Sequence, residues 1–381
     1  MKAPLRPFEY MAWAKTVPVG ARFDLTASGV PDALGESRPG VPAFAAPEDW
    51  HEGLDLASLT RREVAIAAQR ELTDAVAKRY ELDSSCVAVT LAASTAILHA
   101  LIALVRAGDH VVVERPTYEA LRRAPEILGA MVSRLERRFD EDWAVVPERL
   151  AQLLTPRTRA VILTNLHNPS GVAIDTKTMK QIADLAARVG AMVLVDEVYL
   201  DYCATTDENR PQPAACIAKN GVSWSSTTKA FGFSAIRAGW VVTPDPDVAK
   251  AIRAATDYLH VTPPVATARL GARVLERADA LVQRSSSIAV EGRAVIERWL
   301  DVESRVQWVP PAAGITCFLK LPSFMSDTAL SDHLRQRYDT QVVPGSMFEQ
   351  PGFVRVSFGL EPATLQQGLA NFSATLDELT R

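Results

Sequence analysis

Cysteine is scarce in this chain, and neither sign of charge dominates it. The four cysteines, at 86, 203, 216 and 317, are widely spaced and form no CxxC pair. This spacing argues against a disulfide framework or a zinc site, and it favours reduced thiols in a cytoplasmic protein. The formal net charge is only −4 without long blocks of one sign, so we expect no nucleic-acid partner. The densest basic stretch, around Arg134, Arg137 and Arg138, is interrupted by Glu136, and we interpret it as a solvated surface.

Long hydrophobic runs of the membrane-spanning kind are also lacking. The N-terminal sequence MKAPLRPFEYMAWAK contains charged residues and no continuous apolar core, so we expect no secretory signal. Residues 86–105 carry no formal charge, but Thr90, Ser94, Thr95 and His99 interrupt them. We interpret this segment as a buried strand, a turn and a buried helix, and we expect no membrane partner. The histidines show no metal-ligand spacing, so no metal is predicted.

The chain contains enough apolar sequence for more than one core. Hydrophobic residues make up 48% and charged residues 23% of the 381 positions, as in ordinary globular proteins. This length exceeds what one hydrophobic core normally serves. Prolines are dense in the first 50 residues, which is typical of an extended arm. We predict an N-terminal arm that forms part of the small domain over residues 1–48, a large domain over 49–285 and a small C-terminal domain over 286–381.

Short β-branched segments alternate with amphipathic ones from about residue 61, which predicts an α/β fold with a mostly parallel sheet flanked by helices. The runs VVVE, AVILT and MVLVD are apolar throughout, as in strands that are covered on both faces. A long helical region after Pro264, followed by strands and a final helix, predicts a smaller α+β unit. The expected strands are 87–90, 110–114, 160–164, 191–195, 222–225, 238–243, 316–319, 340–343 and 353–357.

Small polar clusters follow the predicted strands of the large domain. Ligands of open α/β sheets bind outside the carboxyl ends of the strands, so we expect these clusters to converge. Each cluster is weak by itself, because an aspartate often caps a helix and a lysine is usually a solvated surface residue. The clusters are Ala92 to Thr95, Pro116 to Tyr118, Asn165 to Gly171, Asp196 to Tyr199, and Ser225 to Lys229 with Arg237.

Taken in order, these clusters resemble the signature of the class I/II aminotransferases, pyridoxal-5'-phosphate enzymes of fold type I, the aspartate-aminotransferase fold. The resemblance runs from about Gly29 to Arg355 and includes NPSG, DEVY, SSTTKAFGFSAIRAGW and FVRVSFG. It implies that Lys229 carries pyridoxal phosphate as a Schiff base and also moves the proton between substrate and cofactor.

The resemblance also implies roles for residues around the cofactor ring. Asp196 holds the proton of the pyridine nitrogen and so keeps the ring an electron sink. Tyr199 and Asn168 donate hydrogen bonds to the phenolate oxygen, and Tyr118 stacks on the ring. The expected catalytic residues are Lys229, Asp196 and Tyr199.

The cofactor phosphate and the substrate have their own implied partners. The segment beginning at Ala92 ends a strand and opens a helix, whose N-terminus favours an anion. Many relatives have glycine where Ala92 stands. The expected phosphate ligands are the backbone of Ala93, Ser94, Ser226 and Arg237. The expected substrate-binding residues are Gly29, Asn168 and Arg355, of which Arg355 clamps the α-carboxylate.

Departures from the family pattern leave the substrate open. The segment HEGLDLASLTRREV lacks the tyrosine that many relatives direct at the phosphate of the partner subunit. No arginine for a second substrate carboxylate is assignable within residues 257–262, so a dicarboxylate preference is unsupported. The aromatic residues Phe8, Tyr10 and Trp13 either line a substrate channel or pack against a partner subunit, and we favour the second.

The implied function is that of a pyridoxal-phosphate-dependent aminotransferase, which moves an amino group between an L-amino acid and a 2-oxo acid through the Lys229 Schiff base, as a cytoplasmic homodimer. A lyase, racemase, decarboxylase or oxidase on the same scaffold shares these residues and is the alternative. A non-catalytic ligand sensor is disfavoured, because Lys229 and Arg355 are both intact.

Overall fold

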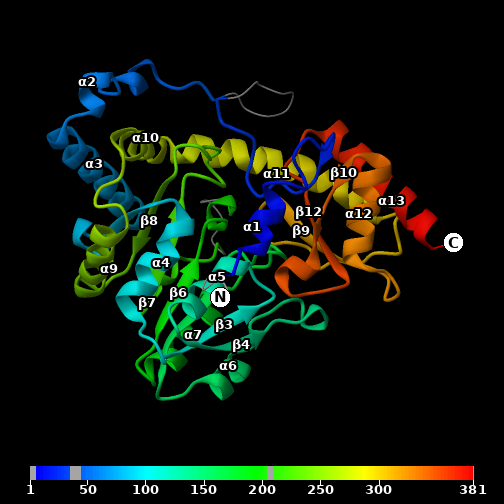
Figure 1. Cartoon of the computed structure of the whole chain (residues 1–381), viewed down its shortest axis with the longest axis horizontal. Helices are drawn as coiled ribbons and strands as arrows, with labels where there is room; N and C mark the ends of the chain where they lie inside the picture. The colour runs from blue at the N-terminus through cyan, green and yellow to red at the C-terminus, as the bar shows by residue number, and fades with distance from the viewer. Residues whose placement is uncertain (1–5, 35–43, 204–209, 381) are drawn as a thin grey trace, which may run out of the picture.

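A computed structural model describes residues 6–34, 44–203 and 210–380. Its centre is a seven-stranded sheet in the order β2-β8-β7-β6-β5-β3-β4 (Figure 1). Within this sheet β8 runs antiparallel to β2 and β7, and the other neighbours are parallel. The strands are Val87–Leu91 (β2), His110–Arg115 (β3), Met131–Glu136 (β4), Thr158–Thr164 (β5), Met192–Asp196 (β6), Gly221–Ser226 (β7) and Ala238–Val242 (β8).

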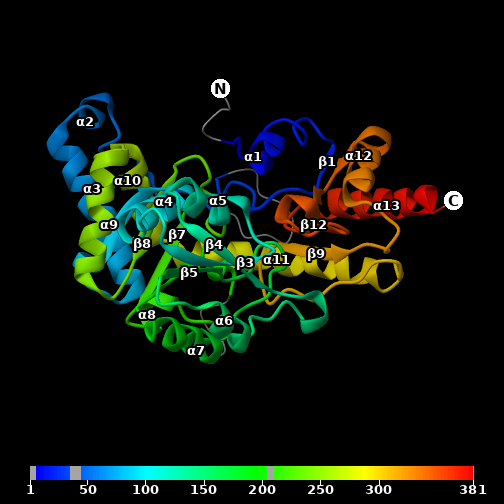
Figure 2. The ribbon, with the colours of Figure 1, turned by 60° about the horizontal axis from the view of Figure 1, so that its bottom comes forward.

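Helices cover both faces of this sheet because successive strand residues point to opposite sides. Val111 and Val113 of β3 face a core with α4 and α5, whereas Val112 faces a core with α7. Figure 2 shows α4 and α5 on one side of the sheet and α7 and α8 on the other. These helices are Arg62–Tyr80 (α3), Ala93–Leu104 (α4), Glu119–Ile127 (α5), Pro147–Leu153 (α6), Thr176–Ala187 (α7), Ala214–Ile217 (α8), Pro246–Leu259 (α9) and Val265–Glu276 (α10).

A smaller unit packs beside the central sheet. The strands β9 (Thr316–Lys320), β11 (Val343–Pro344) and β12 (Phe353–Ser357) form an antiparallel sheet in the order β11-β12-β9. The N-terminal strand β1 (Phe23–Asp24) pairs in parallel with β10 (Thr340–Gln341), so residues from both ends of the chain meet here. Helices α11 (Ala278–Leu300), α12 (Asp327–Tyr338) and α13 (Pro362–Leu379) enclose the core of this unit.

Short elements complete the description. They are α1 (Glu9–Ala14), α2 (Leu56–Leu59) and the 3-10 helices Glu48–His51, Ser84–Cys86, Phe139–Glu141, Leu200–Tyr202 and Gly345–Phe348. The segment 86–105 forms the strand, turn and helix that its sequence predicts. Across the described residues, none of the helices combines the length and the apolar character that a bilayer crossing requires.

Strand β4 corrects our interpretation of the basic stretch as a solvated surface. Arg134 and Glu136 lie in this edge strand, and the next residue, Arg137, is only 1% exposed. The Arg137 guanidinium lies 3.0 Å from the carboxylate of Glu114, and neither side chain is exposed. Thr164 donates a further hydrogen bond of 2.5 Å to Glu114. The stretch therefore holds a buried ion pair beside the end of β3.

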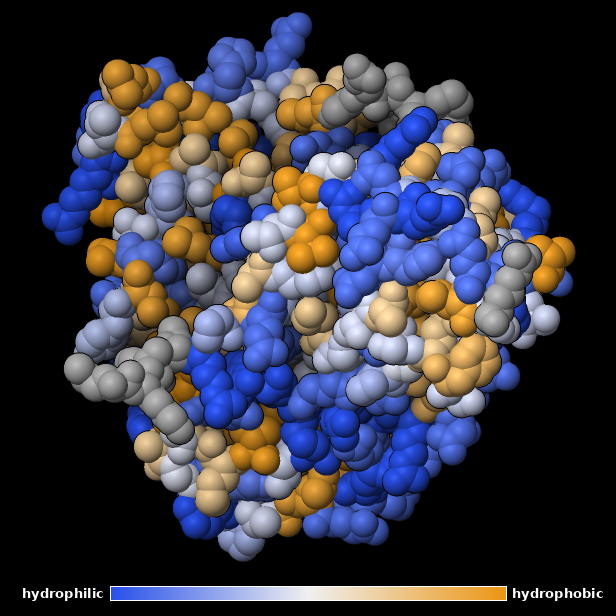
Figure 3. Space-filling model, turned by 45° about the vertical axis from the view of Figure 1, so that its right-hand side comes forward, coloured by the Kyte–Doolittle hydropathy of each residue, from blue (hydrophilic) through white to orange (hydrophobic). Residues whose placement is uncertain are grey.

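Some apolar side chains remain exposed on one side of the molecule. Leu56 is 78%, Leu59 41% and Ile66 39% exposed. Figure 3 shows hydrophobic side chains gathered at its upper left, the side on which Figure 1 places α2 and α3. Exposed apolar side chains that gather on one side of a protein are typical of an interaction site.

Candidate active site

A cavity of about 610 Å³ lies at the carboxyl ends of the central strands and reaches β12 of the smaller unit. Most of the residues singled out from the sequence line it, which confirms that the clusters converge. The predicted residues in its wall are Ala93, Ser94, Tyr118, Asn168, Asp196, Tyr199, Lys229, Arg237 and Arg355. Gly29 and Ser226 do not contribute to this wall.

Lys229 follows β7 and extends into the cavity. Its Nζ donates a hydrogen bond of 2.6 Å to the Oγ of Ser28. Burial lowers the pKa of Lys229 to about 8, assisted by the positive charge of Arg355, while Asp196 opposes the shift. A lowered pKa increases the fraction of neutral amine, which is the nucleophilic form. Ser28 was missed from the sequence, although it directly precedes the singled-out Gly29.

Asp196 ends β6 and lies within the electrostatic influence of Lys229. Burial raises the pKa of Asp196 to about 6, against a hydrogen bond from the backbone of Val198 and the charge of Lys229, which both lower it. The Val198 N–H lies 3.2 Å from the Asp196 Oδ1. A buried carboxyl with a raised pKa gains most from a cationic partner, such as a protonated ring nitrogen.

Tyrosine side chains surround these two groups. Burial raises the pKa of the Tyr199 phenol and of the Tyr118 phenol, so both stay protonated donors at neutral pH. Tyr202 donates a hydrogen bond of 3.2 Å to the backbone carbonyl of Lys229 and stacks on Tyr199 at 6.2 Å between ring centroids. Tyr202 thus fixes the backbone that carries the lysine. It was missed because a tyrosine three residues after Tyr199 carries no signal by itself.

A candidate anion site lies where β2 turns into α4. The Nη2 of Arg237 donates a hydrogen bond of 3.0 Å to the Oγ of Ser94, in the first turn of α4. The helix N-terminus, a hydroxyl and a guanidinium thereby face the same space, as a phosphate requires. Ser226 is fully buried and its Oγ lies 2.7 Å from the Thr228 hydroxyl, so Thr228, and not Ser226, reaches the cavity wall.

Ala92 makes this turn in a conformation that favours glycine. It has φ 62° and ψ 174°, and it precedes the first residue of α4. Gly239 of β8 packs against it, and a Cβ there would lie 2.5 Å from the Ala92 Cα. The turn therefore leaves no room for a Cβ at residue 239, and Ala92 carries the strain of a positive φ.

We expect Ala92→Gly to raise the free energy of unfolding by about 1 kcal/mol, because glycine adopts this backbone without a steric cost. Urea unfolding of the holoenzyme measures the change. The matched variant Ala93→Gly lies in the helix itself and should lower the free energy of unfolding by about 0.5–1 kcal/mol. Equal losses in both variants would show that Ala92 is not strained.

Arg355 on β12 is buried at the boundary between the two units, with 1% of its surface exposed. It donates hydrogen bonds to the Asn168 Oδ1 at 3.2 Å, to the Thr26 carbonyl at 2.9 Å and to the Tyr10 hydroxyl at 3.1 Å. Because the Asn168 oxygen is engaged, its amide N–H groups remain available to another acceptor in the cavity. This guanidinium is held in place for a planar anion such as a carboxylate.

The structure gives Gly29 a packing role, which differs from the direct substrate binding that the sequence predicts. A Cβ at this position would lie 3.0 Å from the Thr228 carbonyl oxygen and 3.5 Å from the Lys229 Cδ. The backbone at Gly29 therefore passes directly behind the lysine. Glycine is needed for this close approach.

The N-terminal aromatic residues lie in the cavity wall of their own chain. Phe8, Tyr10 and Trp13 all line it, together with Met11. Their position agrees with the first of the two alternatives, a substrate channel. The sequence alone favours the second, packing against a partner subunit. Sequence reasoning could not place them, because nothing in the sequence of α1 tells where the helix docks.

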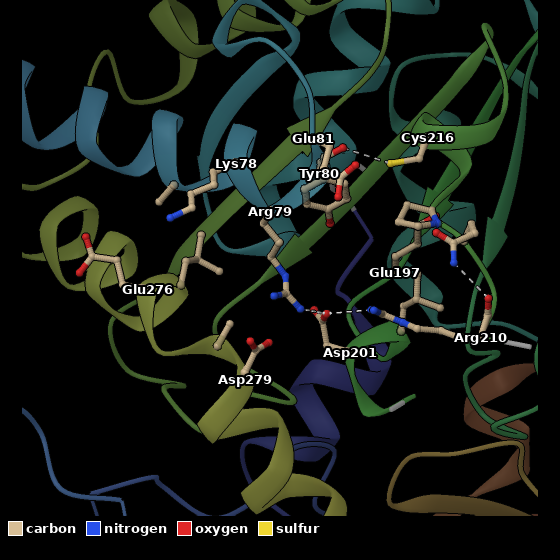
Figure 4. Close-up of a pocket in the computed structure, with 16 residues that line it drawn as sticks. Lys78, Arg79, Tyr80, Glu81, Glu197, Asp201, Arg210, Cys216, Glu276 and Asp279 are labelled. Atoms are coloured by element: carbon tan, nitrogen blue, oxygen red, sulfur yellow. Dashed lines mark hydrogen bonds and ion pairs between the residues drawn. The ribbon is translucent and has the colours of Figure 1, made fainter. Parts of the chain in front are cut away.

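A second cavity, of about 600 Å³, lies behind the active site. Glu197 follows Asp196 and points to the opposite side, as neighbouring residues of an extended chain do. Figure 4 shows Arg79 and Arg210 directed at Asp201 near Glu197. Burial raises the pKa of Glu197 to about 8, although the backbone N–H of Ala214 donates to its Oε1 at 2.8 Å.

Glu197 predicts a pH dependence of stability. Its folded carboxyl stays protonated up to about pH 8, whereas the unfolded carboxyl ionises near its ordinary value of 4.5. Unfolding thus releases a proton between these values, and the free energy of unfolding falls as pH rises through that window. The slope is at most about 1.4 kcal/mol per pH unit.

We expect Glu197→Gln to flatten this slope in urea unfolding of the holoenzyme between about pH 5.5 and about pH 7.5. Glu63→Gln is the matched control, because the Glu63 side chain is 74% exposed and should leave the slope unchanged. A Glu197→Gln profile parallel to that of the unaltered protein would contradict the assignment.

Comparison with known proteins identifies the family to which this chain is similar. A family model described as aminotransferase class I and II matches residues 41–372. Capreomycidine synthase of Streptomyces vinaceus is 29% identical over 378 residues, which cover 98% of this chain and 94% of that protein. Arginine–pyruvate transaminase of Pseudomonas aeruginosa is 25% identical over 329 residues, with 82% of each chain covered.

Solved structures confirm the predicted fold class. A PLP-dependent aminotransferase from Streptococcus suis 89-1591 has a TM-score of 0.84 and 25% identity, with 99% of both chains covered. Aspartate aminotransferase from Thermus thermophilus with maleate has a TM-score of 0.81 and 20% identity over 97% of both chains, and so shares the fold.

Proposed function

The chain belongs to the aminotransferase class I and II family, and from this premise we propose that Lys229 carries pyridoxal phosphate as a Schiff base. The protein is a pyridoxal-phosphate-dependent aminotransferase, acting on an amino acid and a 2-oxo acid. The observation that carries the proposed residue roles is the convergence of Lys229, Asp196, Arg237 and Arg355 on one cavity.

The donor set of the cavity fits this cofactor. Arg237, Ser94 and the N-terminus of α4 would hold the phosphate. Asp196, with its raised pKa, would hold the protonated ring nitrogen, and Tyr118 would cover a ring face. The bound cofactor supplies an electron sink for the substrate Cα, and the protein supplies binding, orientation and proton transfer.

Lys229 is the group we assign to proton transfer. Its pKa of about 8 leaves a usable fraction of free amine near neutral pH, so the Nζ accepts the proton from the substrate Cα and later returns it. Ser28, at 2.6 Å from the Nζ, orients the amine. Tyr199 and the amide of Asn168 would donate hydrogen bonds to the cofactor oxygen.

Arg355 would bind the α-carboxylate of the substrate. Its contacts with Asn168 and Thr26 hold the guanidinium plane, so little side-chain freedom is lost when the carboxylate binds. A bidentate pair of this kind fixes the direction of the Cα–H bond.

We also propose a cellular location, an oligomeric state and a domain division for this enzyme. Four cysteines without a disulfide support a cytoplasmic location. The exposed apolar side chains of α2 and α3 support a homodimer. The central sheet, whose strands all lie between Val87 and Val242, supports a large domain within residues 49–285, and α11 continues from this domain across residue 285 into the smaller unit.

The visible absorption spectrum of the holoenzyme, during titration with single amino acids and then 2-oxo acids, tests this function. We expect the band of the lysine-bound cofactor to disappear with an amino acid and to return with a 2-oxo acid. Release of ammonia or of a cleaved product without this reversible change would instead identify a lyase or oxidase.

A further inference from the structure

The cavity wall facing the cofactor residues is formed by the N-terminal helix α1, and its composition bears on the substrate. Resting on the proposed function, we propose that α1 forms the substrate side-chain pocket and selects amino acids with a large, uncharged, apolar or aromatic side chain. Trp13 is the specificity-determining residue of this pocket, and Tyr10 is a positioning residue for Arg355.

The helix is held over the site by a defined contact. The backbone N–H of Tyr10 donates a hydrogen bond of 2.8 Å to the Oε2 of Glu119, which is only 2% exposed. Glu119 directly follows Tyr118, so the residue that covers the cofactor and the residue that docks α1 are neighbours. Figures 1 and 2 both place α1 between α5 and β12, over the junction of the two units.

Aromatic contacts tie the helix to both sides of the cavity. The ring of Tyr10 lies 5.3 Å from that of Tyr118 in an edge-on arrangement, and 5.7 Å from that of Phe348. Phe8 lies 5.4 Å from Tyr118, and Trp13 lies 6.1 Å from Tyr10. Trp13 is only partly buried, so its ring retains surface for a ligand. Such rings supply large apolar contact area with little loss of conformational freedom.

The charges that this chain places in the cavity wall disfavour substrates with a charged side chain. Among the described residues of the wall, the acidic side chain is Asp196 and the basic ones are Lys229, Arg237 and Arg355. Each of these has a proposed partner in the cofactor or the α-carboxylate. An acidic substrate side chain would find no further cation among the described wall residues of its own chain, and a guanidinium side chain would find no carboxylate there, so both would lose hydration without a partner from this chain.

Tyr10 connects the side-chain pocket to the carboxylate site. Its hydroxyl accepts a hydrogen bond of 3.1 Å from Arg355, whose guanidinium also lies 5.9 Å from the centre of the Tyr10 ring. The same helix therefore touches the side chain of the substrate and the arginine that binds its carboxylate. A substrate whose side chain packs against α1 can therefore place its carboxylate on Arg355 at the same time.

Deamino analogues test the pocket without turnover, because they lack the group that reacts. Calorimetric titration of the holoenzyme should show 3-phenylpropanoate binding at least about tenfold more tightly than succinate or 5-guanidinopentanoate, since burial of one aromatic side chain is worth about one to two orders of magnitude. Tighter binding of succinate or of the guanidino acid would overturn the proposal.

Two variants locate the effect. Trp13→Ala should lower the ratio of kcat/KM for phenylalanine to that for alanine by about tenfold. Tyr10→Phe should raise KM for both amino acids with little change in kcat, because it affects binding of the carboxylate alone. Val19→Ala is the matched control beyond α1, since Val19 is 65% exposed and should leave the ratio unchanged. An unchanged ratio in Trp13→Ala would overturn the assignment of Trp13.

The outcomes separate this inference from the proposed function. If aspartate or arginine converts the lysine-bound cofactor faster than phenylalanine, leucine and methionine do, the pocket proposal is wrong and the aminotransferase assignment stands. If no amino acid converts it, the proposed function fails, and the binding order of the analogues still decides whether α1 recognises apolar side chains.

Discussion

Lys229→Ala is expected to abolish the visible band of the lysine-bound cofactor and to lower kcat by at least about ten-thousand-fold, because one amine serves both as the covalent attachment and as the proton carrier. The absorption spectrum after addition of pyridoxal phosphate, together with single-turnover kinetics, measures both losses. The cofactor phosphate should still bind, since Arg237 and Ser94 are unchanged.

The matched control is Lys219→Ala, because Lys219 is an exposed lysine on the approach to β7. It should keep the band and the rate within about twofold, as expected of a surface substitution. A band that persists in Lys229→Ala and disappears in Lys219→Ala would place the Schiff base at Lys219. That result would remove the basis of the proposed mechanism.

Arg137→Met is expected to lower the free energy of unfolding by about 3–5 kcal/mol, because it leaves a buried carboxylate without its cation. Burial raises the pKa of Glu114 and lowers that of Arg137, and their mutual attraction at 3.0 Å opposes both shifts. Urea unfolding of the holoenzyme measures the loss.

A double variant distinguishes the cost of breaking the ion pair from the cost of replacing both of its residues. Arg137→Met with Glu114→Leu should recover much of the stability, since an apolar pair of similar volume replaces a buried ion pair at little cost. Arg138→Met is the control, because that side chain is 56% exposed and should change stability by less than about 0.5 kcal/mol. A loss in Arg138→Met as large as in Arg137→Met would show that burial is not the cause.

The proposed cofactor residues Asp196 and Lys229 were predictable because each lies at or shortly after the end of a buried strand of the central sheet. Asp196 ends β6, whose apolar residues are covered on both faces, and Lys229 follows β7, whose six residues are all buried. Strand β4 was not predicted, because it is the edge of the sheet and its charged residues resemble a surface segment. Edge strands commonly carry such charges, which prevent pairing with other chains.

The side-chain pocket was beyond sequence reasoning for a different reason. Its position depends on the contact between α1 and Glu119, which are 109 residues apart. A short helix of six residues has too little pattern to identify its partner. The hydroxyl in the cavity wall is a smaller case: Ser226 is the last residue of β7, whereas Thr228 lies two residues beyond it, where the chain no longer follows the alternation of a strand.

The hydrogen bond between Tyr10 and Arg355 spans 345 residues, nearly the whole chain. During synthesis the helix α1 leaves the ribosome 345 residues before its arginine partner. The central sheet can form before that moment, but the substrate pocket has no complete wall until β12 has paired. Loop closure over so many residues costs entropy, so we expect the wall that contacts the substrate side chain to form late as this chain folds.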